Sequence, residues 1–339
     1  MRNFLFALLL LLAVYFFISR FAEIENVVET LRRGDWRWLS LAIVLSLAGM
    51  VNIAALLRAL YRLLGMEETI QRLFILGASA FFVNVIAPAA GVSGMAVIVS
   101  DTRARGHPPG RVTTAVALYT LYDYLAFLIV LGLGLTVLIR RNQLGVGELA
   151  ASAILVLIAG GLGFLLFLGM RSSEQLGRVL AWLARLVNML LRPFLHHAYL
   201  HEERAHEFAH DISEGLHEAR KSAAGLSLPL ALALSRHAIN IAILFMIFVA
   251  FKQSFSAGTI VAGYAIGYLF LIVSPTPSGI GFVEGAMTLA LTTLRVPLEA
   301  AAVITLAYRG ITLWLSLLYG LIAFRWIGRH PATATDSRP

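Results

Sequence analysis

The stretch Ser274-Pro275-Thr276-Pro277-Ser278-Gly279-Ile280-Gly281 interrupts an apolar run that extends from Gly258 to Leu294. Proline removes a helical hydrogen bond, and glycine loosens the backbone. Unwound backbone at membrane depth is tolerated only inside protein or beside a water-filled cavity. The stretch therefore predicts a re-entrant hairpin, which enters a membrane and returns to the same face.

A second break of the same kind lies in the apolar run Leu73–Ser100. Its centre reads Asn84-Val85-Ile86-Ala87-Pro88-Ala89-Ala90-Gly91-Val92-Ser93-Gly94. When Pro88 is aligned with Pro275, Gly94 falls on Gly281. We interpret the two hairpins as parts of two divergent copies of one unit, as in many transporters.

The rest of the chain is typical of a multi-pass membrane protein. Of its 339 residues, 59% are hydrophobic and only 14% are charged, with a mean hydropathy of +0.81. A soluble domain carries about 25% charged residues, and a membrane-crossing helix needs about 20 apolar residues. Six segments fit such a helix: Asn3–Ser19, Trp38–Leu57, Val112–Ile139, Leu149–Met170, Leu226–Ala250 and Ala300–Ala323. The predicted fold is an all-α membrane bundle of about six full spans and two re-entrant hairpins.

The first apolar segment resembles a signal peptide, but no small-x-small cleavage site follows it. We therefore expect an uncleaved first span with the N-terminus in the cytoplasm. Three full spans then separate the hairpins, which enter from opposite faces and form an inverted repeat. Of the 27 Lys and Arg residues, seventeen fall in the predicted cytoplasmic segments and eight on the other face. This bias favours a bacterial inner (plasma) membrane protein with both termini cytoplasmic.

Residues 1–325 are predicted to form a single membrane domain, and residues 326–339 a disordered cytoplasmic tail. Within the domain, residues 171–222 are too polar to span a membrane. Their first half has apolar residues at helical spacing and a basic stripe that recurs every seven residues: Arg178, Arg185 and Arg192. This pattern predicts an amphipathic helix in the cytoplasmic interface, where the stripe would contact anionic lipid.

Four charged residues fall within the apolar segments: Asp123, Arg236, Glu284 and Arg309. Charges at membrane depth are costly, so they are usually paired or functional. One interpretation is that they are structural ion pairs, with Glu284 and Arg309 the obvious couple. The other is that they line a polar cavity between the two broken segments. Both interpretations stay open at this point.

The breaks themselves favour the cavity. Short half-helices point free N–H groups at a site, and such ends attract phosphate or carboxylate. The candidate binding residues in the two breaks are Pro277, Gly279 and Gly281 in the second and Asn84, Pro88 and Gly91 in the first. Together with Arg309 and Arg236 they predict an anion-tolerant cavity in mid-membrane.

The segment His206-Glu207-Phe208-Ala209-His210 reads HExxH, the zinc motif of metalloproteases. It lies in a solvated, His-rich stretch with no apolar shell, so we interpret His206, Glu207 and His210 as a chance match and predict no metal site. The chain has no cysteine and no GxxxxGK[ST] sequence, and we expect no cofactor. We attribute its net charge of +8 to basic loops that contact anionic membrane lipids, and we therefore expect no nucleic-acid partner.

The motif Pro277-Ser278-Gly279-Ile280-Gly281-Phe282-Val283-Glu284, followed by Tyr308-Arg309, resembles the flippase-like transmembrane domain of lysylphosphatidylglycerol synthases. Asn84…Pro88-Ala89-Ala90-Gly91 adds to the resemblance, which extends from about Asn3 to Ala323. In the first hairpin this chain departs from the family pattern, because Gly94–Ser100 is uncharged.

The resemblance implies a helical bundle with paired re-entrant segments that moves lipids between leaflets. It also implies that Glu284 and Arg309 occupy the family's acidic and basic positions. Only Arg325–Pro339 follows the last predicted span, so we expect no aminoacyl-transfer activity and no enzyme. Three alternatives stay open: transport of a polyprenyl-phosphate-linked sugar, an intramembrane lipid-phosphate enzyme, and a scaffold subunit. The sequence also leaves open a homo-oligomer or a lipid-synthesising partner enzyme.

Overall fold

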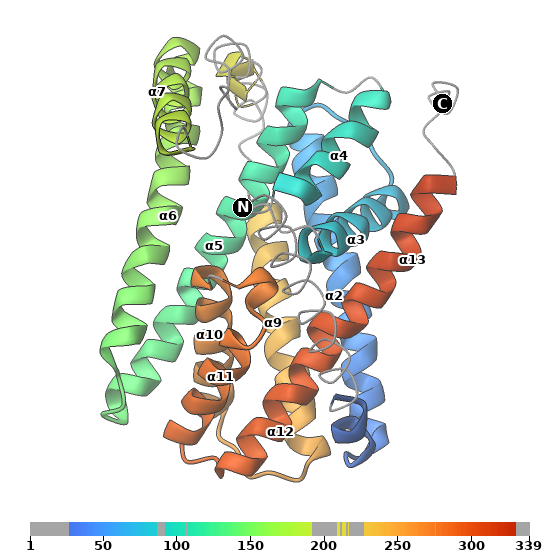
Figure 1. Cartoon of the computed structure of the whole chain (residues 1–339), viewed down its shortest axis with the longest axis vertical. Coiled ribbons are helices and arrows are strands. Elements are labelled where there is room, and N and C mark those ends of the chain that lie inside the picture. The colour runs from blue at the N-terminus through green and yellow to red at the C-terminus, as the bar shows by residue number, and fades with distance from the viewer. Residues whose placement is uncertain are drawn as a thin grey trace, which may run out of the picture.

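A computed structural model describes residues 27–86, 92–105, 108–191, 209–210, 212–214, 216, 227–274 and 276–329. Within these ranges every regular element is helical (Figure 1). The long helices are α2 (Trp36–Leu63), α5 (Pro109–Arg140), α6 (Val146–Arg171) and α9 (Ser227–Ala250). A fifth long segment consists of α12 (Leu298–Arg309), a π-helical turn (Gly310–Trp314) and α13 (Leu315–Arg329).

These five segments are helices that are long and apolar enough to cross a membrane, and they coincide with five of the six predicted spans. The sixth, Asn3–Ser19, lies outside the described residues. Several helices extend beyond the predicted limits. Helix α2, for example, continues past Leu57 to Leu63, because Arg58 and Arg62 can keep their charged heads near the membrane surface while their stems stay apolar. The described chain is a multi-pass helical membrane protein.

Helices α2 and α9 form the centre of the bundle and run antiparallel. The backbone N–H of Asp35, just before α2, donates to the carbonyl oxygen of Ala250 at the end of α9 (3.0 Å). Further along the same seam, Asn52 Nδ2 donates to Ser235 Oγ at 2.6 Å. The first residues of one helix therefore lie beside the last residues of the other, as two inverted copies require.

Two pairs of shorter helices pack around this centre. The first hairpin consists of α3 (Ile70–Ile86) and α4 (Val92–Ala104), and the second of α10 (Ala257–Val273) and α11 (Phe282–Thr293). Each of these helices has 12 to 17 residues. At 1.5 Å per residue they are roughly 18–26 Å long, shorter than the ~30 Å hydrocarbon core. Figure 1 shows the two hairpins at opposite ends of the bundle, which we call the first-hairpin end and the second-hairpin end.

The two halves exchange contacts reciprocally. Helix α5 follows the first hairpin and packs against α10 of the second, while α13 follows the second hairpin and packs against α3 of the first. The turn Pro277–Gly279 in the second break also contacts α3. This exchange is consistent with the predicted inverted repeat, and it places the centre of the second break beside the first hairpin.

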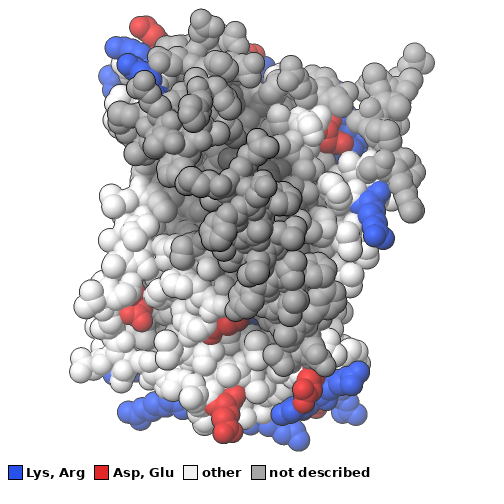
Figure 2. Space-filling model, viewed as in Figure 1, with Lys and Arg blue, Asp and Glu red and all other residues white. Residues whose placement is uncertain are grey.

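The buried apolar side chains form two clusters, one around each hairpin. Phe127, Phe248 and Tyr264 are among the largest buried side chains of the cluster around α10 and α11. Leu60 and Tyr61 are among those around α3. Many other apolar side chains point outward from the long helices, as lipid-facing surfaces require, and Figure 2 shows Lys and Arg gathered toward the two ends of the molecule.

The polar segment after α6 begins with helix α7 (Ser173–Leu191), as predicted. Arg178 and Arg185 are exposed on it, and Arg192 lies outside the described residues. At the other end of the chain, α13 continues to Arg329, four residues into the segment predicted to be a tail. Trp326 packs there against the Arg72 guanidinium, 5.8 Å from its ring centre, which gives the extra turn a tertiary contact.

Candidate functional site

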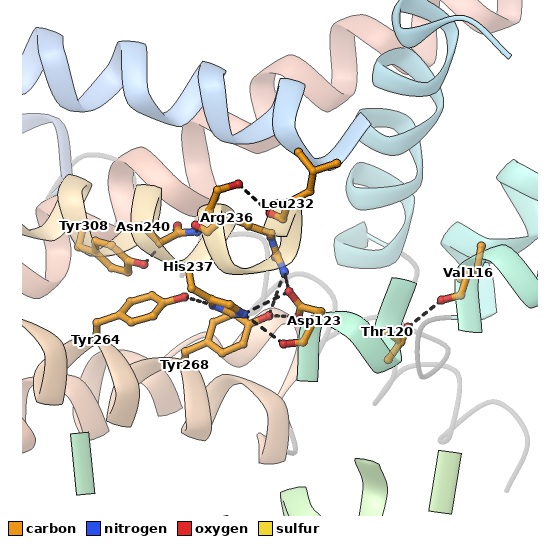
Figure 3. Close-up of polar contacts among 11 residues, drawn as sticks. Val116, Thr120, Asp123, Leu232, Arg236, His237, Asn240, Tyr264, Tyr268 and Tyr308 are labelled. Carbon is orange, nitrogen blue, oxygen red and sulfur yellow. Dashed lines mark hydrogen bonds and ion pairs between the residues drawn. The ribbon is translucent and has the colours of Figure 1, made fainter. Parts of the chain in front are cut away.

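A polar network of charged and aromatic side chains lies inside the apolar bundle (Figure 3). Helix α5 contributes Asp123, α9 contributes Arg236 and α10 contributes Tyr268. The Arg236 guanidinium forms an ion pair with one Asp123 carboxylate oxygen. The Tyr268 hydroxyl donates to the other oxygen at 2.6 Å and accepts from Arg236 Nη1 at 3.2 Å. Three helices are thus joined by one charged pair and one hydroxyl.

His237 completes the buried side of this network. Its Nδ1 lies 2.6 Å from the Tyr264 hydroxyl, and its Nε2 lies 3.2 Å from the backbone carbonyl oxygen of Asp123. The ring also packs against Phe127 and Tyr268, with centroid distances of 5.5 and 5.1 Å. Because both ring nitrogens have partners and the side chain is fully buried, His237 fixes the relative positions of α5, α9 and α10.

On its other side the network reaches a cavity of about 130 Å³ between α2, α3, α9 and the π-helical turn. An ordered water needs only roughly 10–15 Å³, so the cavity has room for several. Its polar lining residues are Ser46, Arg236, Asn240, Thr312 and Ser316, and its small ones are Gly49, Gly77 and Ala78. Asn240 is held in place because its Nδ2 donates to the Arg236 carbonyl oxygen (2.9 Å) and its Oδ1 accepts from Tyr308 (3.4 Å). We call this space the central cavity.

The predicted couple of Glu284 and Arg309 is confirmed as a second buried ion pair. Arg309 Nε donates to Glu284 Oε1 at 2.5 Å, and Arg309 Nη2 donates to the carbonyl oxygen of Ser278 at 2.7 Å. The other carboxylate oxygen, Glu284 Oε2, is buried and has no hydrogen-bond partner among the described residues. The pair joins α12 to the second break and leaves one acceptor unused.

The second break owes its shape to three residues in the left-handed region: Ser278, Gly279 and Gly281, with φ of 53°, 72° and 78°. Glycine adopts this conformation without strain. Gly279 is also packed tightly, since a Cβ there would lie 2.3 Å from Val283 Cγ2 and 3.0 Å from Leu271 Cδ1. Pro277 begins the turn. These candidate residues therefore set the backbone path that presents the Ser278 carbonyl to Arg309.

In the first break, Asn84 has a structural role. Its Oδ1 accepts a hydrogen bond at 2.7 Å from the backbone N–H of Gly94, in the first turn of α4. A side-chain oxygen at this place satisfies a free N–H group of the helix start. Asn84 thereby fastens the end of α3 to the start of α4. Pro88 and Gly91 lie outside the described residues.

Several features of the site were not predicted from the sequence. Tyr264 and Tyr268 are spaced i, i+4, so their side chains lie on one face of α10. This spacing was a signal in the sequence that both hydroxyls could take part in one polar network. The π-helical turn directly after Arg309 has no sequence signal beyond Gly310, although π-helical segments are frequent at functional sites.

A third buried ion pair also went unpredicted. At the open end of the first hairpin, Arg72 Nε donates to Asp101 Oδ2 at 3.2 Å. Arg105 lies 3.5 Å from the same carboxylate oxygen. The pair joins the first turn of α3 to the last turn of α4, so it closes this hairpin at the end opposite its break.

Of the chance HExxH residues, only His210 lies in the described part of the chain. The described residues contain no group of three or more side chains able to hold a metal ion. The prediction concerning His206 and Glu207 lies outside the residues that the structure describes.

Comparison with known proteins places this architecture in a family. Residues 4–320 match the family described as the lysylphosphatidylglycerol synthase TM region. No curated protein matches the chain. The match includes both hairpins, the central cavity and all three buried ion pairs.

Proposed function

The chain belongs to the lysylphosphatidylglycerol synthase TM-region family, and from this premise we propose that it moves a phospholipid between the leaflets of a membrane. The family is membrane-associated and related to lipid flippase-like domains. A phospholipid headgroup crosses the hydrocarbon core only where the protein offers polar groups. The central cavity supports the proposal most directly, because it offers such groups inside an otherwise apolar bundle.

Arg236 is the proposed headgroup ligand. Its side chain is 18% exposed, against 6% for its partner Asp123, and it is the charged residue that lines the central cavity. A guanidinium matches the planar, two-point geometry of a phosphate oxygen pair. Asn240, Ser46 and Thr312 supply further amide and hydroxyl groups along the same space.

The buried ion pairs determine the energetic cost of moving a headgroup through the bundle. Removing one partner of a buried pair costs about 3–5 kcal/mol, because the other charge is left uncompensated. A headgroup phosphate can bind the exposed side of the Arg236 guanidinium while Asp123 keeps its contact, so neither Arg236 nor Asp123 is left uncompensated. Glu284 Oε2, which has no hydrogen-bond partner among the described residues, could accept a hydrogen bond from a cationic headgroup or bind a proton.

Motion of the second hairpin is proposed to open and close the path. Arg309 holds the break through the Ser278 carbonyl, and the π-helical turn that follows Arg309 lines the central cavity through Thr312. A shift of the Glu284–Arg309 pair would therefore move the π-helical turn and change the position of Thr312 in the cavity wall. In an inverted repeat, exchange of conformation between the two halves exposes a central site to each face in turn.

The membrane placement is part of the proposal. We assign the chain to a bacterial inner membrane with both hairpins re-entrant and both termini cytoplasmic. The exposed Arg178 and Arg185 on α7 would gather anionic lipid at the cytoplasmic surface.

A leaflet-sidedness assay tests the proposal. Purified full-length protein is placed in liposomes that contain a fluorescent phospholipid, and an impermeant reductant bleaches the outer leaflet. The proposal predicts that the bleached fraction exceeds the half seen in protein-free liposomes, and that extracted lipid is chemically unchanged. Correctly folded protein that moves no lipid contradicts it, and a new lipid species would favour the enzyme alternative. A series of headgroups, including a polyprenyl-phosphate-linked sugar, identifies the cargo.

A further inference from the structure

A second, larger pocket lies at the second-hairpin end of the bundle, away from the central cavity. It has a volume of about 600 Å³, within the ~300–1,000 Å³ typical of small-molecule sites. Three loops form it, namely those between α5 and α6, between α9 and α10, and between α11 and α12. The first and the third loop contribute arginines. The lining includes Arg140, Arg141, Phe255, Ser256, Thr259 and Arg295.

The positive charge of this pocket is not balanced within it. No Asp or Glu is among its lining residues in the part of the chain that the structure describes. Arg141 is held only by neutral acceptors: Nη2 donates to Ser256 Oγ at 2.8 Å, and Nη1 donates to Thr259 Oγ1 at 3.2 Å. Within the described part of the chain, neither Arg140 nor Arg295 takes part in an ion pair. Three guanidinium groups thus share one pocket without a carboxylate.

The equivalent place in the first half of the chain shows the contrast. The offset of 187 residues that aligns Pro88 with Pro275 places Thr259 on Arg72 and Thr288 on Asp101. The first half therefore has a buried arginine with its own carboxylate. In the second half both positions are threonine, and the arginine is Arg141, directly after α5. The second half therefore has a cation at this place without the acidic partner that the first half has.

Apolar side chains continue from the pocket onto the outer surface. Phe255 lines it and is 43% exposed, and Ile139, directly before Arg140, is 61% exposed. Leu298, at the start of α12, is 60% exposed. Figure 2 shows basic side chains gathered at this end of the molecule, with some acidic side chains among them, below the apolar surface. A basic pocket bordered by lipid-facing side chains suits a molecule that is both anionic and amphiphilic.

We propose that this pocket binds the phosphate group of an anionic phospholipid, with the acyl chains lying against the outer surface near Ile139 and Phe255. Arg141 is the preformed ligand, because its contacts fix the guanidinium at low entropic cost. Arg140, at the same end of α5 as Arg141, and Arg295, just after the end of α11, complete the basic lining around the phosphate. The site holds a lipid at the bundle end, so it does not depend on the translocation proposed above.

The test uses full-length protein in detergent and variants that spare the anchored Arg141. Arg140→Gln combined with Arg295→Asn removes two charges. Asparagine suits position 295 because the backbone there is left-handed, with φ of 71°, a conformation that asparagine tolerates. Arg37→Gln is the matched control, since Arg37 is exposed near the same end but does not line the pocket.

Binding is measured with short-chain phosphatidylglycerol, short-chain phosphatidylcholine and inorganic phosphate. We expect phosphatidylglycerol to bind most tightly, and the double variant to weaken it about tenfold or more while Arg37→Gln leaves it unchanged. Equal affinity in the double variant and the wild type overturns the site. Inorganic phosphate that binds as tightly as the lipid overturns the assignment to a phospholipid. Because this is an equilibrium measurement, its result is separate from that of the translocation assay.

Discussion

Arg309 and Glu284 lie 25 residues apart in the chain, and Arg309 Nε donates to Glu284 Oε1 at 2.5 Å. The same guanidinium donates to the backbone of the second break at Ser278, so one side chain joins α12, α11 and the break. Since Arg309 is buried and the Glu284 side chain is only 14% exposed, each depends on the other for charge compensation. This relationship makes a double-mutant cycle informative.

We predict that Arg309→Met lowers the thermal midpoint strongly, because Glu284 is then a buried, unpaired carboxylate, with a loss of about 3–5 kcal/mol. Adding Glu284→Gln should restore much of that loss. Thermal unfolding in detergent, followed by size-exclusion chromatography, measures both variants. If the two single effects simply add in the double variant, the pair is not the stabilising unit described.

Tyr268 should stabilise the network around Asp123. Tyr268→Phe removes the hydroxyl that contacts both Asp123 and Arg236, so we expect a loss of about 1–3 kcal/mol. Tyr124→Phe on α5 is the control, because the Tyr124 hydroxyl has no hydrogen-bond partner among the described residues and the change should be nearly neutral. The measurement is the thermal midpoint of each purified variant. Equal midpoints for Tyr268→Phe and the wild type would contradict the prediction.

The second break should be sensitive to a single methyl group. Gly279→Ala places a Cβ against Val283 and Leu271 and forces alanine into a left-handed conformation, which costs about 1–2 kcal/mol before the clash is counted. Gly285→Ala in α11 is the control, since no described atom lies within 4 Å of its added Cβ. We expect Gly279→Ala alone to reduce folded yield and thermal midpoint. A neutral Gly279→Ala would show that the break is free to rearrange.

The positions of the long helices could be predicted from the sequence, because spans depend on local hydropathy alone. Their ends could not be fixed as closely, since residues such as Arg58 and Trp326 are accommodated by snorkelling or by packing against a distant side chain. The two short pairs were predictable as well, because proline and glycine interrupt apolar runs that are otherwise continuous.

The contacts between helices were predictable only in part. The pairing of Glu284 with Arg309 was predicted correctly, because the two residues lie on consecutive helices in a segment with few other charged residues. The pair of Asp123 and Arg236 joins residues 113 positions apart, and its formation depends on how α5 packs against α9. Hydropathy does not encode that packing. The π-helical turn likewise depends on tertiary contacts, among them the hydrogen bond from Ser46 Oγ to the Ile311 carbonyl oxygen at 3.3 Å.

The most direct test of the account is to fill the central cavity while leaving every charge in place. Gly49 lines it, and a Cβ there meets only Ile239 Cγ2 at 3.6 Å, so Gly49→Leu would occupy the space. Gly132→Leu on the outer face of α5 is the control, because no described atom lies within 4 Å of its added Cβ. In the leaflet-sidedness assay, the account predicts wild-type rates for Gly132→Leu and a rate at least about tenfold lower for folded Gly49→Leu, equivalent to about 1.4 kcal/mol in the barrier. Lipid movement by Gly49→Leu at the wild-type rate would contradict a path through this cavity.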